Sequence, residues 1–513
     1  MVLFESILAY LLGAVLLAAL ARRMGVAYPV MLAVAGAALA FVPNVPQIPL
    51  DPDLVLVLFV APILLDAGFD TSVRDLRRNW RCIGGLVVVA VGLTTVAVAC
   101  VTRWLVPEIP WAAAIALGAI VAPPDAVAAT AILRRVRPPH RLIVILEGES
   151  LLNDATALLI YRLAVAAVAA GSFSPVDALP TFGLVVFGSV ALGGCLGWLV
   201  VRLLARFEDA PSLIILQFIT TFGVWILSER LHLSGIITIV VYAMVLAWSV
   251  PAMTSARLRI PMYAVWETAI FVLQIFAFIL VGLQLRPIFG NLDAATIAKY
   301  GVVAVAVLVT TIVVRLVWVF FDHRVASFSL PHDAPRDDLQ PDVTSRSDGI
   351  IIAWCGMRGI VTLAAAYALP VHFPYRDLIL ICAFGVVVGT LVVQGLTLPL
   401  LLHHLPIEDH HPIEREFRTA RRQALEAAMG AIAEHRTGAA GMVQAEYAEM
   451  LQQSLEEETA DTEQNRLRRK ALAVARDKAL EMRRAGEIGD NAFHKLEEEL
   501  DWLELGAVAR SSA

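Results

Sequence analysis

Long apolar stretches dominate the first 405 residues of the chain, and polar residues interrupt them only at intervals. In windows of about 20 residues the side chains are apolar on every side, whereas a helix of a soluble protein would show one polar face. We therefore predict an all-α polytopic membrane protein with about 13 transmembrane helices. The predicted spans begin near residues 4, 27, 53, 82, 110, 143, 180, 212, 233, 265, 296, 349 and 376.

Basic residues between the predicted spans indicate which loops face the cytoplasm. Arginines gather in the loops that follow odd-numbered spans, such as Arg22-Arg23 and residues 74–81, and are sparse after even-numbered spans, as around Arg103. Cytoplasmic loops carry the excess of positive charge, so the N-terminus is expected outside and the C-terminus in the cytoplasm. No basic residue precedes the first apolar run, which favours an uncleaved first span in the inner (plasma) membrane.

The composition changes abruptly after residue 405, from apolar residues to Glu, Arg, Ala and Gln. Residues 406–513 are rich in helix formers and charges, which predicts a soluble, mostly helical tail on the cytoplasmic side. Two roles fit this tail: a solvated helical hairpin without chemistry, or a regulatory or dimerising segment. Residues 1–405 form the predicted transmembrane domain that precedes it.

Composition also argues against several classes of protein. The chain is 58% hydrophobic and 17% charged, and it has no basic patch with interleaved aromatic residues, so no nucleic-acid partner is expected. Its five cysteines lie in or beside apolar segments without metal-site spacing. No glycine-rich phosphate loop is present, and we expect no enzyme and no cofactor. These features favour a secondary transporter.

Charged residues lie inside the sixth predicted span, in the run from Glu147 to Asp154. A charge at the centre of a bilayer costs about 2.5–3.5 kcal/mol, so it is tolerated mainly where it is paired or binds something. At helical spacing Ser150 and Asp154 share one face, and Glu149 and Asn153 share the neighbouring face. This run predicts an ion site built on one turn of a membrane helix.

The fifth predicted span contains two consecutive prolines, Pro123 and Pro124, followed by Asp125. The prolines remove two backbone donors, so the helix must open at this point. We expect the carbonyl groups freed near Ala119 and Ile120 to form a cation cradle with the Asp125 carboxylate. Alternatively, the prolines only kink the helix and the carboxylate is satisfied by other partners.

The twelfth predicted span is weakened at a corresponding depth by Gly356-Met357-Arg358-Gly359, in which two glycines flank a permanent cation. Matching interruptions in two halves of a chain are typical of transporters with inverted repeats, in which two discontinuous helices cross at the substrate site. The fifth and twelfth spans are therefore predicted to cross.

A cation buried at that depth needs a counter-charge, and we expect Glu149 to pair with Arg358, which leaves Asp154 to titrate. In the third span, Asp66 stands between Pro62 and Gly68. That setting fits a gate or an ion ligand inside the membrane, and it fits equally a charge at a loop end near the inner surface.

Together these motifs resemble the cation:proton antiporter-1 family of sodium/proton exchangers. The segment Gly-Glu-Ser-Leu-Leu-Asn-Asp at residues 148–154 carries the resemblance, with Pro124-Asp125 upstream and Gly356-Met357-Arg358-Gly359 downstream. Residues 65–68 also resemble the third-span motif of that family. The resemblance covers about residues 1–405, with the motifs in the same order.

The resemblance implies an NhaA-like antiporter fold, a homodimer with an elevator-like moving core, and electroneutral exchange of one Na⁺ for one H⁺. It implies that Asp154 binds either ion and that Asn153 stabilises the crossing of the broken helices. It further implies that Ser150 and Asp125 complete the shell around the transported Na⁺, and that Glu149 forms its structural ion pair with Arg358.

One departure from the family concerns ion selectivity. Many members carry a threonine before the fifth-span aspartate, where this chain has Pro124, so any ligation from this position must come from the backbone carbonyl. Asn153 distinguishes the chain from a sister family with two adjacent aspartates, whose electrogenic members often have a core lysine. Here Lys299 lies in a predicted outer loop and the other lysines lie in the tail, which favours electroneutral exchange.

The predicted mechanism is competition for one carboxylate. Na⁺ binds only deprotonated Asp154, so Na⁺ and a proton exclude each other, and an empty carboxylate is costly to carry through a low-dielectric barrier. Other readings are an antiporter of the same fold for Li⁺ or K⁺, a passive cation channel, and an intramembrane protease using Asp125 and Asp154. The chain lacks the paired Tyr-Asp and Gly-x-Gly-Asp motifs of such a protease, and a channel would carry current without moving protons.

Overall fold

The structure is a computed structural model of the chain. It describes residues 2–24, 26–43, 54, 56–133, 138–170, 175–283, 293–328, 346–405, 412–434, 437–455, 463–485, 487 and 490–507. Two compact units can be separated, Met1–Asp409 and His410–Ala513. All regular secondary structure within these described ranges is helical.

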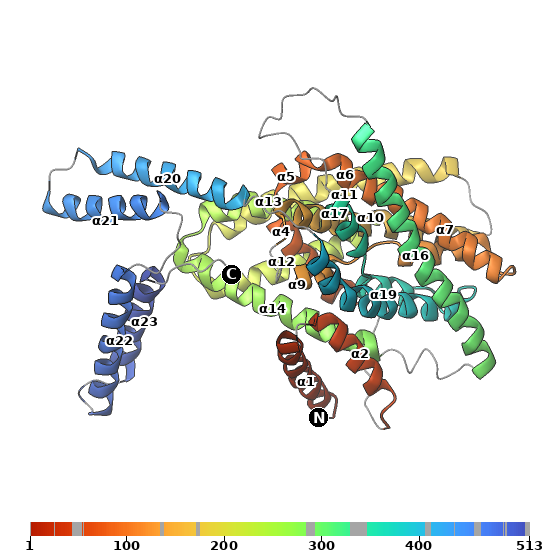
Figure 1. The fold of residues 1–513 in the computed structure, drawn as a ribbon, viewed down its shortest axis with the longest axis horizontal. Coiled ribbons are helices and arrows are strands. Elements are labelled where there is room, and N and C mark those ends of the chain that lie inside the picture. Colours follow the sequence, from red (N-terminus) through yellow and green to blue (C-terminus); the bar gives the residue numbers. More distant parts are fainter. Residues whose placement is uncertain are drawn as a thin grey trace. The chain divides into compact units, whose positions relative to one another are not determined.

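The first unit is a succession of helices joined mostly by short connections (Figure 1). Its elements are α1 (Val2–Met24), α2 (Tyr28–Ala40), the π-helical η1 (Leu56–Val60), α4 (Ala61–Asp70), α5 (Val73–Arg78), α6 (Trp80–Gly84), the π-helical η2 (Gly85–Ala90), α7 (Val91–Leu105), α8 (Trp111–Val121), α9 (Ala126–Leu133), α10 (His140–Ala170), α11 (Pro175–Leu204), α12 (Ala210–Arg230), α13 (Gly235–Met253), α14 (Ala256–Leu283), α16 (Ala294–Phe328), α17 (Arg346–Trp354), α18 (Ile360–Tyr367) and α19 (Arg376–His404).

Helix length and apolarity support the prediction of a multi-pass membrane protein. In the described part of the chain, 9 helices are long and apolar enough to cross a membrane, and α2 and α8 are shorter apolar helices. These lengths do not establish the predicted count of thirteen spans, because several predicted spans consist of two shorter elements. The third span is η1 with α4, the fifth is α8 with α9, and the twelfth is α17 with α18.

Both predicted helix breaks are confirmed. The fifth span leaves helical geometry between Val121 and Ala126, where the prolines lie, and the twelfth leaves it between Trp354 and Ile360, where Gly356 and Gly359 lie. Non-helical backbone survives at membrane depth only where protein or a water-filled cavity surrounds it. The two breaks satisfy this requirement by lying against each other.

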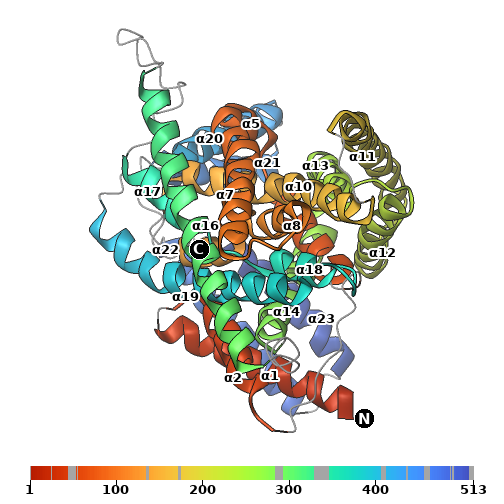
Figure 2. The same cartoon turned by 90° about the vertical axis from the view of Figure 1, so that its right-hand side faces the viewer.

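Helix α10 occupies the middle of this unit, with α7 and α8 on one side and the group α11, α12 and α13 on the other (Figure 2). Helix α10 contacts both α8 and α13. Helix α16 packs against α7 and α19, and the largest buried apolar cluster spreads through these helices and α2, α8, α14 and α18. The helix with the predicted ion site is therefore surrounded by protein along much of its length.

Helices α2 and α14 approach each other most closely at a pair of glycines. A Cβ atom on Gly36 would overlap the carbonyl oxygen of Ile279, and one on Gly282 would overlap the backbone of Ala33 and Ala37. Small residues at a helix crossing let the two backbones meet, as is common between membrane helices. This crossing fixes α2 and α14 as one packed pair.

The second unit consists of two helical hairpins (Figure 1). Helices α20 (Pro412–Ile432) and α21 (Gly438–Leu455) form one, and α22 (Glu463–Arg484) and α23 (Asp490–Ala507) form the other. In the latter, Arg476 of α22 forms ion pairs with Asp501 and Glu504 of α23. The helices of this unit agree with the predicted helical tail, while its cytoplasmic location and its role stay predictions.

The close approach of α2 and α14 at Gly36 and Gly282 leads to a testable prediction about stability. We expect Gly36→Ala to lower the melting temperature of the detergent-solubilised protein, because overpacking costs about 1–3 kcal/mol. The matched control is Gly13→Ala on α1, where no atom lies within 4 Å of an added Cβ. The control should leave the melting temperature unchanged or raise it slightly, and equal behaviour of the two variants would contradict the close approach.

Candidate functional site

Helix α10 presents the predicted ion-site residues to the interior of the first unit. Glu149 is 1% exposed, Asn153 0% and Asp154 6%, while Ser150 is half-buried one turn before Asp154. A charged side chain is almost never this buried unless it has a partner or a ligand. The groups that surround these side chains therefore decide what the site can bind.

The two breaks meet beside α10 through the backbone. The amide of Asp125 donates a hydrogen bond of 2.7 Å to the carbonyl oxygen of Met357, which joins the fifth-span break to the twelfth-span break. A Cβ atom on Gly359 would overlap the carboxylate of Asp125, so this carboxylate lies directly against bare backbone. The absence of a side chain at position 359 is what makes room for the acid.

Asn153 links α10 to this crossing. Its Nδ2 donates to the carbonyl oxygen of Pro124 at 3.3 Å, while the stabilising role that the family resemblance implied stays a prediction. Its other polar atom, Oδ1, is buried and has no hydrogen-bond partner among the described residues. An unpaired buried carbonyl oxygen is costly, and it is also the type of atom that hard cations bind.

The prediction that Arg358 pairs with Glu149 is wrong. Arg358 is 1% exposed and donates instead to backbone carbonyls: Nε to Val121 at 3.0 Å, Nη2 to Ala122 at 3.1 Å, and Nη1 to Gly356. A helix that ends inside the protein leaves its last carbonyl groups unpaired, and a cation at that end is favoured by the helix dipole. Arg358 therefore closes the open end of α8, while the cradle predicted from the carbonyls near Ala119 and Ile120 stays a prediction.

The partner of Glu149 is Arg315, in the middle of α16. Arg315 Nη2 lies 2.8 Å from Glu149 Oε2, and Nη1 contacts the other carboxylate oxygen. The guanidinium also donates to the carbonyl oxygen of Ile352 in α17, at 2.9 and 3.2 Å. Arg315 is 3% exposed, so the pair ties α10, α16 and α17 together in the interior.

Sequence reasoning missed Arg315 although a signal existed. The residue is the single arginine of a mostly apolar 28-residue segment, whose other charged residue, Lys299, lies near its start. An ionisable residue in the middle of such a segment indicates a buried partner or a function. A further contact explains one of the twelfth-span glycines, because a Cβ atom on Gly356 would overlap the Arg315 side chain. Gly356 makes room for the pair between Arg315 and Glu149.

A cavity of about 1060 Å³ reaches the acidic residues. Among its lining residues are Asp66 of α4, Pro124 and Asp125 of the break, and Ser150 and Asp154 of α10. The structure thus brings all of these predicted ion ligands to one hollow, and Asp66 lies on its wall together with Asp154. Glu149 and Arg358 do not line it, which fits a structural role for both.

The charges in this cavity favour a cation. Asp125 lies close enough to Asp154 for the two carboxylates to repel each other when both are ionised. Two negative charges in a poorly hydrated site are stabilised by a bound cation or by a proton on one of them. Carboxylate and hydroxyl oxygens suit hard cations, and the cavity offers them from Asp125, Asp154 and Ser150.

Substitutions of Arg315 and of Arg358 are expected to respond differently to the removal of the charge on Glu149. Arg315→Met leaves a buried carboxylate unpaired, which costs about 3–5 kcal/mol, so we expect little folded protein after detergent extraction. Adding Glu149→Gln removes that charge and should recover a large part of the melting temperature, as measured by size-exclusion chromatography after heating. The remaining loss corresponds to the hydrogen bonds with Ile352.

The control is Arg358→Met with the same second substitution. Because Arg358 serves the carbonyls of Val121, Ala122 and Gly356, Glu149→Gln should not recover this variant. If Glu149→Gln recovered Arg358→Met but not Arg315→Met, the result would support the pairing of Glu149 with Arg358 that the sequence predicted.

Comparisons with known proteins agree with this arrangement. A family model described as "Sodium/hydrogen exchanger, transmembrane" matches residues 8–404. An uncharacterized Na⁺/H⁺ exchanger of Mycobacterium tuberculosis is 31% identical over 429 residues, which cover 80% of this chain and 76% of that protein. The sodium, potassium, lithium and rubidium/H⁺ antiporter of Bacillus subtilis is 28% identical over 486 residues, covering 89% of this chain and 71% of that protein.

A solved structure shares the fold. The sodium proton antiporter MjNhaP1 of Methanocaldococcus jannaschii, at pH 8, superposes with a TM-score of 0.62 at 16% sequence identity. The match covers 79% of this chain and 99% of that chain, so the two proteins share the fold over most of this chain. From the extent of the family match and of the relatives, the chain belongs to the sodium/hydrogen exchanger family.

Proposed function

We propose that this protein exchanges Na⁺ for H⁺ across a membrane, with both ions competing for the carboxylate of Asp154. The observation that carries the proposal is the position of this carboxylate. It is 6% exposed, lines a cavity and lies beside the crossing of two broken helices with a second carboxylate, Asp125, nearby. Among the described residues Asp154 has no hydrogen-bond or ion-pair partner, so an ion can be its counter-charge.

The exchange follows from the cost of an empty site. Ionised Asp154 without a partner would carry a bare charge through a low-dielectric barrier, whereas either Na⁺ or H⁺ neutralises it. The site therefore changes sides only when one ion is bound, and each ion can be released only where the other can replace it. One carboxylate that takes one monovalent ion at a time gives electroneutral exchange.

The oxygen atoms around the cavity supply the proposed ion shell. Asp125 and Ser150 face the same cavity as Asp154. Asn153, which precedes Asp154 in the chain, adds an oxygen, Oδ1, that has no partner among the described residues. The carbonyl oxygen of Pro124 already accepts from Asn153, so its contribution is shared with the helix crossing. Asp66 of α4 lines the same cavity, where it can bind an ion on its way to Asp154.

Sodium is the better substrate assignment than potassium alone. The relatives reported above are named for sodium, and the Bacillus antiporter adds potassium, lithium and rubidium to sodium. A channel would need a path open to both faces, whereas the cavity runs along α10 only as far as Asp154. Antiporters are transporters and do not form an enzyme class. The proposed chemistry is the binding and release of Na⁺ and H⁺.

The membrane setting completes the proposal. We place the N-terminus outside and the C-terminus with the second unit in the cytoplasm of a plasma-membrane protein, because arginines gather in the loops after odd-numbered spans. The same orientation places the cavity opening, with Glu147 and Arg22 on its wall, on the cytoplasmic side. A homodimer is carried over from the family resemblance.

The first test is Asp154→Asn in proteoliposomes. We expect at least a hundredfold loss of Na⁺-driven proton movement, recorded with a pH-sensitive dye, because a neutral amide carries no counter-charge for Na⁺ and does not take up the exchanged proton. Glu147→Gln, on the same cavity wall and the same helix, is the matched control and should keep most of the activity. In the wild type, a fall in pH should raise the apparent KM for Na⁺ at constant maximal rate, as competition requires.

Two results would contradict the mechanism. Sustained exchange by Asp154→Asn would remove this carboxylate from the ion path. A wild-type maximal rate that falls with pH while the KM stays constant would show that the proton acts elsewhere than at the Na⁺ site.

Gly359→Ala tests the place of Asp125 in the ion shell. The added methyl group overlaps the Asp125 carboxylate, so we expect the apparent KM for Na⁺ to rise about tenfold, equivalent to about 1.4 kcal/mol. Gly349→Ala on α17 is the control, since its Cβ would meet Val319 Cγ1 at an ordinary 3.7 Å. An unchanged KM in a folded Gly359→Ala protein would exclude Asp125 as an ion ligand.

A further inference from the structure

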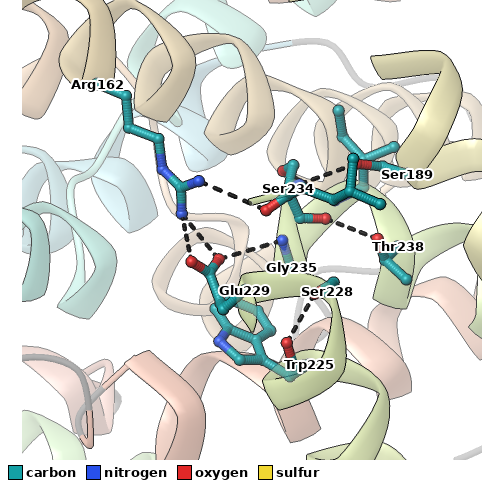
Figure 3. A network of polar contacts seen from close by, with 10 residues as sticks. Arg162, Ser189, Trp225, Ser228, Glu229, Ser234, Gly235 and Thr238 are labelled. Carbon is teal, nitrogen blue, oxygen red and sulfur yellow. Dashed lines mark hydrogen bonds and ion pairs between the residues drawn. The ribbon is translucent and has the colours of Figure 1, made fainter. Parts of the chain in front are cut away.

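Arg162 extends from α10 toward the connection between α12 and α13, two turns beyond Asp154 (Figure 3). Its Nη2 lies 2.8 and 2.7 Å from the two carboxylate oxygens of Glu229, and Nη1 lies 3.4 Å from the carbonyl oxygen of Leu233. The planar guanidinium matches a carboxylate in this way, which gives the contact a defined geometry. Arg162 is the member of this network that α10 contributes.

The receiving surface is built independently of Arg162. Glu229, in the last turn of α12, also accepts from the backbone amide of Gly235 at 3.3 Å. Ser234 caps the start of α13, and its own amide donates to Ser189 of α11 at 2.9 Å. These bonds hold the carboxylate in place on the α12–α13 connection, so Arg162 meets a preformed acceptor (Figure 3).

The cavity ends before this network. On α10 it is lined by Glu147, Ser150, Leu151 and Asp154, and by no described residue farther along the helix. Beyond that point Ala155 and Leu158 pack against the apolar cluster of α12 and α13, which includes the buried residues Trp225, Ile236, Ile239 and Val240. Eight residues of helix span about 12 Å, so an apolar layer and then the Arg162–Glu229 pair separate Asp154 from the far end of α10.

This arrangement matters because an antiporter must present one site to two faces in turn. The cavity opens Asp154 to one face, so the contacts between α10 and the α12–α13 connection close the other face. For the ion to leave on that other side, these contacts must separate. We propose that the Arg162–Glu229 pair is a positioning contact for transport: it holds the ion-site helix against the α12–α13 connection while the cavity is open, and it releases when Asp154 turns to the opposite face.

The exposure of the pair suits a contact that opens in every cycle. Arg162 and Glu229 have side chains that are 46% and 38% exposed, so water can replace their mutual bonds at little cost. The pair between Arg315 and Glu149 is 3% and 1% exposed and would leave a buried charge if it opened. One ion pair on α10 is therefore permanent and the other reversible.

The test is a charge reversal read from both faces of the membrane; it rests on the proposed exchange of Na⁺ for H⁺. The variants are Arg162→Glu, Glu229→Arg and the double reversal, each measured in inside-out and right-side-out vesicles. Each single reversal should raise the apparent KM for Na⁺ on the face of the cavity by about two- to fivefold and lower it on the other face, because fewer molecules keep the site open to the cavity. The double reversal should restore both values.

Controls separate this role from a merely structural one. Arg162→Gln should show the same opposite shifts in smaller size, and Arg162→Lys should lie close to the wild type. Arg202→Gln, an exposed arginine of α11 that stacks on Trp198, should change neither KM. If a reversal variant does not fold, the Gln and Lys variants supply the measurement.

Two outcomes would overturn the proposal. In one, KM stays constant on both faces in the reversals and in Arg162→Gln while Asp154→Asn is inactive, so the exchange mechanism stands and the positioning role falls. In the other, KM rises on both faces and the double reversal does not restore it, so the pair only supports the fold. Absence of Na⁺-driven proton movement in the wild type would remove the proposed function and this inference together.

Discussion

Helix α8 can end inside the membrane-spanning unit because one guanidinium, that of Arg358, donates hydrogen bonds to the carbonyl groups at its end. Arg358 donates to the carbonyl groups of Val121, Ala122 and Gly356, and its own amide donates to Thr390 at 3.0 Å. Without these bonds the break would leave unpaired carbonyls at membrane depth, each costing about 1–3 kcal/mol. The crossing of the two breaks therefore depends on this side chain, together with the bonds from Asp125 to Met357 and from Asn153 to Pro124.

The sequence was informative about the break points and the acidic turn because their signals are local. Prolines 123 and 124 remove backbone donors wherever the chain places them, and the spacing of Glu149, Asn153 and Asp154 on a helix is fixed by its period. The partners of these residues were not predictable in the same way. Arg315 is 166 residues from Glu149, and the sequence pattern pointed to Arg358 as the partner of this acid instead.

Depth alone could not choose between the two arginines. The choice was made by lateral packing, since α16 brings Arg315 against Glu149 while the twelfth-span break turns Arg358 toward the end of α8. The same limit applies to Glu229, which nothing in its local sequence connects with Arg162. Ion pairs between distant helices become visible only when the helices are arranged in space, whereas the helices themselves follow from the apolar pattern.

The bare backbone at Gly359 has a consequence for how related chains can vary. Because the fifth-span acid fills the volume that a methyl group would take, the residue types at positions 125 and 359 are coupled through space, although 234 residues separate them. A relative with a bulkier residue after its twelfth-span arginine must either shorten or relocate that acid. Substitutions at these two places are therefore expected to occur in pairs, and chains in which they do so mark lineages whose cation shell has been rebuilt.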